Sequence, residues 1–175
     1  MPEHLWATWR LKYIEGADKV EGCIFCQFPA QPPERDKELL ILHRGEHAFI
    51  ILNAYPYSNG HLMVVPYRHT ATMEELTDPE LLEVMRLTRV GVRALSAAFA
   101  PHGFNLGVNM GRVAGAGIAD HLHWHIVPRW SGDTNFMTVL GDVRVIPESL
   151  GNVYDRLQEV LPASLEQSSA DSSSK

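Results

Sequence analysis

The chain has 175 residues, of which 45% are hydrophobic, and 21 acidic against 15 basic side chains give it a formal charge of −6. This length and composition predict one globular domain with its own core. The negative charge argues against nucleic-acid binding, which needs a basic surface, but not against a small anionic ligand held by local donors. No apolar run approaches the roughly 18 residues that a membrane-spanning helix needs.

Residues 1–22 predict an N-terminal arm, with aromatic side chains scattered among charges. They have neither the basic start nor the apolar stretch of a secretory signal. Cys23 and Cys26 are the two cysteines, and their spacing is unlike the disulfide framework of a secreted protein. These features predict a cytoplasmic protein without a membrane partner. Alone, the Cys-x-x-Cys pair fits two buried thiols, a redox pair or half of a zinc site.

Three strands are predicted in the first half of the chain. Residues 39–43 and 47–52 are short apolar runs separated by a turn, which favours a hairpin. A loop at 53–60 follows, with proline and Asn-Gly as breakers. Residues 61–66 then predict the third strand.

A long helix is predicted from Thr77 to the stop at 101–103. Thr77 is a good N-cap, and Glu80 three residues later completes a capping box. Apolar residues recur at intervals of three and four and predict the buried stripe: Leu81, Met85, Thr88, Val92, Leu95 and Phe99.

The second half of the chain predicts two more strands, a shorter helix and a tail. Residues 104–109 predict a fourth strand and residues 150–161 a second helix. The tail at 162–175 is rich in serine and is predicted to be disordered. Hairpin-joined strands with a helix between the third and fourth predict an α+β domain over residues 23–161, an antiparallel five-stranded sheet with one long and one short helix.

The most informative stretch supplies the fifth strand. His121, His123 and His125 alternate with strand-forming apolar residues, which places the three imidazoles on one face. Single histidines are often ordinary hydrogen-bonded groups. Three in register fit a metal site, a surface face, or a nucleophile and proton-transfer site, because neutral imidazole titrates near pH 7.

A glycine-rich connection, residues 109–117, leads into this strand. Its small residues Gly115, Ala116 and Gly117 allow backbone N–H groups to approach an anion closely. Alone this is weak evidence, but beside aligned histidines it indicates a phosphate held against an imidazole.

The stretch His121-Leu122-His123-Trp124-His125-Ile126-Val127 resembles the signature of the histidine triad (HIT) family of nucleotide hydrolases and transferases. The Cys-x-x-Cys pair, residues 52–66 and residues 109–115 are similar to other blocks of that family, in the same order. Within the family, the sequence around the triad most resembles the bacterial diadenosine tetraphosphate phosphorylase (ATP adenylyltransferase) branch. The resemblance implies a HIT-like fold.

The resemblance also implies roles for matching positions. His123 would attack the α-phosphorus of a nucleotide and form a covalent intermediate, and His125 would hold the phosphate. Asn53 and His61 match positions that contact the ribose and line the site, and Asn109 matches a contact to the phosphate chain. The segment 115–117 would add backbone donors, although Gly117 stands where many relatives carry a serine. Because a phosphoryl centre repels anions, a neutral imidazole suits it as a nucleophile.

The resemblance further implies a structural zinc site. Some bacterial relatives bind zinc with the Cys-x-x-Cys pair, a histidine after the third strand and the first triad histidine. The matching residues are Cys23, Cys26, His69 and His121. Four protein ligands would leave no position for an activated water, so the metal would not be catalytic.

The predicted function is therefore nucleotidyl transfer or hydrolysis on dinucleoside polyphosphates such as diadenosine tetraphosphate, in a protein that the resemblance implies is a homodimer. An adenosine 5′-phosphoramidate hydrolase is the second enzyme reading. A nucleotide-binding module with little turnover, or a zinc-organised interaction domain, are alternatives of a different class. The partners expected are nucleotides, with no nucleic acid.

Overall fold

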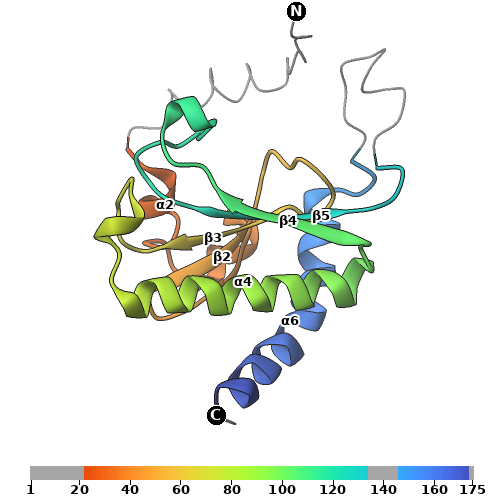
Figure 1. The fold of residues 1–175 in the computed structure, drawn as a ribbon. Coiled ribbons are helices and arrows are strands. Elements are labelled where there is room, and N and C mark those ends of the chain that lie inside the picture. The colour runs from red at the N-terminus through yellow and green to blue at the C-terminus, as the bar shows by residue number, and fades with distance from the viewer. Residues whose placement is uncertain (1–21, 134–145, 174–175) are drawn as a thin grey trace, which may run out of the picture.

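The computed structural model describes residues 22–133 and 146–173 (Figure 1). Its centre is a five-stranded sheet in the order β1-β2-β3-β5-β4, with every neighbouring pair antiparallel. The strands are β1 (Ile41–Arg44), β2 (Ala48–Leu52), β3 (Leu62–Pro66), β4 (Gly103–Val108) and β5 (Trp124–Arg129). The predicted α+β fold with an antiparallel five-stranded sheet is confirmed. The predicted arm at residues 1–22 lies outside the described residues except for Gly22.

Two long helices cover one face of the sheet, α4 (Asp78–Phe99) and α6 (Leu150–Ser173) (Figure 1). Short helical turns connect the other elements: α2 (Ile24–Gln27), η1 (Pro33–Arg35), α3 (Asp36–Leu39), η2 (Met73–Glu75) and η3 (Arg112–Ala114). The capping box at Thr77 and Glu80 starts α4 as predicted. Within the described ranges, no helix is long and apolar enough to cross a membrane.

The sheet has an apolar core on each face. Alternate residues of the strands, such as Ile50, Val64 and Ile126, pack under α4 and α6 in the larger core. The opposite residues, such as Ile51 and Met63, form a smaller cluster with Phe25 of α2. Because side chains alternate along a strand, the histidine of β5 and the two histidines just before it face the smaller cluster, on the side of the sheet away from the long helices.

The buried stripe of α4 differs from the prediction. Thr88 and Leu95 are buried as predicted, but Met85 is 48% exposed. Val84, Gly91 and Ala94, which lay outside the predicted stripe, are buried. The helix is rotated so that small residues meet the sheet: a Cβ on Gly91 would lie 2.6 Å from Ile126 Cδ1. The prediction followed the large apolar residues and therefore missed a close helix–sheet approach that glycine and alanine permit.

The second helix is longer than predicted. It continues through Pro162 to Ser173, beyond the predicted end at residue 161 and into the segment predicted to be a disordered tail. The buried face of Val153, Leu157 and Leu161 continues into Ser164 and Ser168, which are also buried. Serines in place of apolar residues concealed this periodicity.

Candidate active site and metal cluster

The three histidines lie on one side of the sheet, as predicted, but strand β5 begins only at Trp124. His121 and His123 precede it because the backbone there bonds elsewhere. The N–H of Leu122 donates to Thr70 O at 2.7 Å, and His121 O accepts from a side chain. The apolar residues between the histidines are buried under α4, so the predicted division into two faces is confirmed.

His123 is held with one ring nitrogen protonated. Its Nδ1 lies 2.9 Å from His121 O. A carbonyl oxygen only accepts, so Nδ1 carries the proton and Nε2 keeps its lone pair. The side chain is 5% exposed, and its ring centroid lies 5.0 Å from that of Phe25 and 4.9 Å from that of His125. Burial lowers the pKa of His123, which keeps the imidazole neutral near pH 7.

His125 is part of a chain of hydrogen bonds. His61 Nδ1 accepts from the Tyr57 backbone N–H at 3.1 Å, so His61 is protonated on Nε2. That Nε2 lies 2.9 Å from His125 Nδ1 and donates to it. His125 therefore carries its own proton on Nε2. Burial, with a smaller contribution from His123, lowers the pKa of His125 to about 4. His125 is thus an uncharged N–H donor beside the uncharged ring of His123, whose Nε2 keeps its lone pair.

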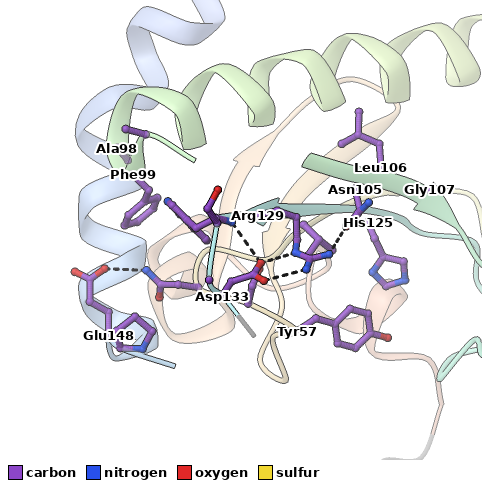
Figure 2. Close-up of a pocket in the computed structure, with 18 of the residues that line it drawn as sticks. Tyr57, Ala98, Phe99, Asn105, Leu106, Gly107, His125, Arg129, Asp133 and Glu148 are labelled. Carbon is purple, nitrogen blue, oxygen red and sulfur yellow. Dashed lines mark hydrogen bonds and ion pairs between the residues drawn. The ribbon is translucent and has the colours of Figure 1, made fainter. Parts of the chain in front are cut away.

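A cleft of about 1220 Å³ adjoins these histidines. It is lined by the open face of β4 and β5, the C-terminal end of α4 and Arg156 of α6. Figure 2 shows His125 and Tyr57 at one end and Phe99 and Glu148 at the other. Asn109 also lines the cleft. The fully buried His61 and the nearly buried His123 adjoin it through His125.

The remaining predicted nucleotide-binding positions are engaged in local bonds. Asn53 Oδ1 accepts from the Tyr55 N–H at 2.9 Å, and its Nδ2 lies 3.2 Å from His61 Nδ1. The N–H groups of Gly115 and Ala116 bond within their own turn, to Arg112 O and Gly111 O. Gly117 is exposed. Nucleotide contacts by these residues stay predictions.

The four predicted metal ligands come together from three parts of the chain. Cys23, Cys26, His69 and His121 offer ligand atoms that all lie within 4.8 Å of one another. His121 Nδ1 is 3.2 Å from Cys23 Sγ, 3.6 Å from Cys26 Sγ and 3.3 Å from His69 Nδ1. Ligands at usual zinc distances, about 2.3 Å for sulfur and about 2.0 Å for nitrogen, lie about 3.3–3.8 Å apart in a tetrahedron. The three separations from His121 Nδ1 are close to this range, and a small inward movement of the wider pairs, which are at most 4.8 Å apart, would fit the four residues to a zinc-sized cation.

The surroundings of this cluster act on its ligand atoms in two opposite ways. His121 Nε2 lies 2.9 Å from Pro66 O and donates to it, so Nδ1 presents a lone pair to the other ligands. Burial and neighbouring Cys23 raise the pKa of the Cys26 thiol. A bound cation would overcome both effects by stabilising the thiolates.

Residues that the sequence did not single out complete the site. Tyr57 fixes the tautomer of His61 through its backbone, which no sequence pattern reveals. Phe25 packs against both His121 and His123. Its position between the two cysteines was a sequence signal that it lies near the cluster. Arg129 enters the cleft four residues after His125, paired with Asp133 and Asn105 (Figure 2).

Comparison with known proteins agrees with this geometry. Residues 34–132 match the HIT domain family. The chain is 44% identical over 153 residues to an AP-4-A phosphorylase of Mycobacterium tuberculosis, covering 85% of this chain and 78% of that protein. It is 32% identical over 108 residues to the adenosine 5′-monophosphoramidase hnt1 of Schizosaccharomyces pombe, covering 62% and 74%. A zinc-bound histidine triad family protein from Mycobacterium smegmatis superposes with a TM-score of 0.64 at 24% identity, covering 86% and 97%.

Proposed function

The chain belongs to the HIT domain family, and from that premise we propose that it is an enzyme that transfers or hydrolyses a nucleotidyl group at the α-phosphate of dinucleoside polyphosphates. The observation that carries the proposal is the pair of neutral rings 4.9 Å apart, His123 with a lone pair on Nε2 and His125 with a proton there. The similarity to a mycobacterial AP-4-A phosphorylase over 85% of the chain supports the choice of substrate.

The proposed reaction has two steps. His123 Nε2 attacks the α-phosphorus, forming an N–P bond while the P–O bond to the leaving nucleotide breaks and the electron pair leaves with that oxygen. His125 Nε2–H donates to a non-bridging phosphate oxygen and stabilises the charge that develops there. Inorganic phosphate or water then attacks the same phosphorus and releases His123. The covalent intermediate divides one difficult displacement into two.

Product analysis tests this proposal. Purified protein is incubated with diadenosine tetraphosphate, with and without inorganic phosphate, beside His123→Ala. Phosphate-dependent formation of ADP and ATP, abolished in the variant, is the expected result. AMP and ATP without added phosphate would make the protein a hydrolase. Absence of turnover here, with cleavage of an adenosine 5′-phosphoramidate, would move it to the activity named for the fission-yeast relative.

A binding module with little turnover is the alternative from another class. It predicts equal nucleotide affinity for the wild type and His123→Ala and no products from either. Mass spectrometry of protein quenched during turnover adds a direct readout, because a nucleotidyl adduct on His123 appears only if the covalent route operates.

We also propose that the Cys23, Cys26, His69 and His121 cluster holds a structural zinc ion. Protein residues would fill all four positions of a tetrahedron, so the ion would tie α2 to the sheet and not activate water. Paired ligand thiols are kept reduced in the cytoplasm, and we propose that location.

A homodimer completes the proposal. Strand β4 lies at the end of the sheet order, and Leu106 on it is 55% exposed. An edge strand offers unpaired backbone groups to a second copy. Sedimentation of the wild type as a dimer, and of Leu106→Asp as a monomer, is expected.

A further inference from the structure

Arg129 is the cationic side chain on the strand face that carries His125. His125 pairs with Gly107 and Arg129 with Gly103 across β4 and β5. A Cβ on either glycine would meet nothing within 4 Å, so the surface between His125 and Arg129 is open to a ligand. Both side chains line the same cleft, and Figure 2 shows Arg129 directed into it.

Neighbouring residues hold the Arg129 guanidinium in place. Nε donates to Asp133 Oδ2 at 2.5 Å, Nη2 to Asp133 Oδ1 at 3.0 Å, and Nη1 to Asn105 Oδ1 at 2.8 Å. Arginine has five N–H donors, so one on each terminal nitrogen has no partner among the described residues. The side chain is 46% exposed and Asp133 only 18%. The carboxylate is thus the inner partner, and the guanidinium presents donors to the cleft.

The position of the guanidinium suits a chain of phosphates. The hydrogen bond to Asn105 places the guanidinium near the cross-strand pair of Asn105 and Val127. The next pair on the same face of the sheet is His125 with Gly107, two residues away along each strand. That separation is two strand rises, roughly 7 Å. His123 lies on the far side of His125 from this position along the chain, with the two rings 4.9 Å apart. Phosphates linked to one held at His123 would therefore come nearer the guanidinium than that phosphate itself.

We propose that Arg129, oriented by Asp133 and Asn105, binds the phosphate groups beyond the α-phosphate and so selects substrates by the length of their polyphosphate chain. This inference rests on the proposed function for the direction of the chain, with the α-phosphate at His123 and the leaving nucleotide toward Arg129. A purely structural role is the competing explanation, because Asp133 also accepts the Trp130 N–H and thereby closes the turn after β5.

Binding measurements separate the two explanations without turnover. Calorimetry on His123→Ala compares ATP with AMP, at fixed ionic strength and without divalent cations. Adding Arg129→Ala is expected to weaken ATP binding about 10- to 100-fold, the loss of one or two charge-assisted hydrogen bonds, and to leave AMP within about twofold. Arg86→Ala on α4 is the matched control and should change neither affinity. Equal losses for ATP and AMP, or no loss for ATP, would overturn the inference.

A second variant keeps the test decisive if Arg129→Ala unfolds. Asn105 is exposed, so Asn105→Asp should fold, and it places a carboxylate against the guanidinium. It should weaken ATP binding and spare AMP; unchanged ATP affinity counts against the inference.

Turnover of diadenosine tri-, tetra- and pentaphosphate distinguishes the two proposals. If wild type cleaves none of them but ATP affinity still depends on Arg129, the enzymatic proposal fails and the phosphate site stands. If His123-dependent cleavage occurs with the same chain-length preference in Arg129→Ala, the phosphate site fails and the enzymatic proposal stands.

Discussion

Replacing His61 by asparagine should disable the site without touching a reacting atom. In the wild type, His61 accepts from the Tyr57 N–H through Nδ1 and donates to His125 through Nε2. The asparagine amide reaches the position of Nδ1 but not that of Nε2. His61→Asn therefore keeps the acceptor for Tyr57 and removes the donor to His125. Glutamine is longer and can supply that donor.

The magnitude follows from burial. His61 is fully buried, so water does not readily replace the lost donor, and an unsatisfied buried acceptor costs about 1–3 kcal/mol. His125 can relieve that cost by moving its proton to Nδ1, which removes the Nε2–H from the phosphate. Loss of a positioned proton donor of this kind predicts about a 100-fold fall in kcat, close to 2.7 kcal/mol.

The assay is steady-state kinetics on the dinucleoside polyphosphate that wild type cleaves, with wild type, His61→Asn and His61→Gln compared after thermal melts confirm folding. His61→Asn should lose kcat with little change in KM, and His61→Gln should recover most of it. Nitrogen-15 NMR of the His125 ring should show protonated Nε2 in wild type and His61→Gln only. Equal activity of the two folded variants, or an unchanged His125 tautomer in His61→Asn, would refute the reasoning.

Three further predictions concern the metal, the titration of the site and the core. Metal analysis should find about one zinc per chain in wild type and none in Cys26→Ser, with a lower Tm; equal zinc in both would contradict the proposed ligand set. The pKa of His125 falls from 6.5 to about 4 on folding, so the unfolded chain binds more protons between these two values. The unfolding free energy should therefore drop by up to about 3 kcal/mol as the pH falls through this window. Denaturant titration should show a smaller drop in His125→Gln. Gly91→Ala should destabilise the protein by about 1–3 kcal/mol, because the new Cβ meets Ile126. Gly151→Ala on α6, where a Cβ meets nothing, should stabilise it by up to about 1 kcal/mol. Chemical denaturation measures both changes, and two changes of the same sign would contradict the packing argument.

Much of the fold was readable from the sequence where periodicity and turn chemistry agree. The capping box at Thr77 is present, and the alternation around His123 separates the two faces as predicted, although the strand itself begins only at Trp124. The errors occur where small or polar residues carry the packing. Gly91 faces the sheet because it is small, and Ser168 lies in the α4–α6 contact with Arg89 hydrogen-bonded to it. Neither signal registers in a pattern of large apolar residues.

The sequence predicts which side chains gather at the site but not the tautomers of its histidines. Through the resemblance to a family, the sequence singled out His123, His125 and the four proposed cysteine and histidine ligands, and the structure brings those four together. The sequence did not indicate which ring nitrogen carries hydrogen. That choice depends on backbone groups such as Pro66 O and the Tyr57 N–H, which tertiary structure alone brings to the rings.

These backbone and side-chain partners give three identical residues three different chemistries. Pro66 O takes the His121 Nε2–H, which leaves Nδ1 as a ligand for a cation. His121 O takes the His123 Nδ1–H, which leaves a lone pair on Nε2, as the proposed nucleophile requires. His61 donates to His125 Nδ1, which leaves an N–H for a phosphate oxygen. His121 belongs to the candidate metal cluster through its ring and holds His123 through its carbonyl, so a shift of its backbone would disturb both groups. In the proposed enzyme, a zinc ion that never touches the substrate would therefore still help to set where the proposed nucleophilic nitrogen lies.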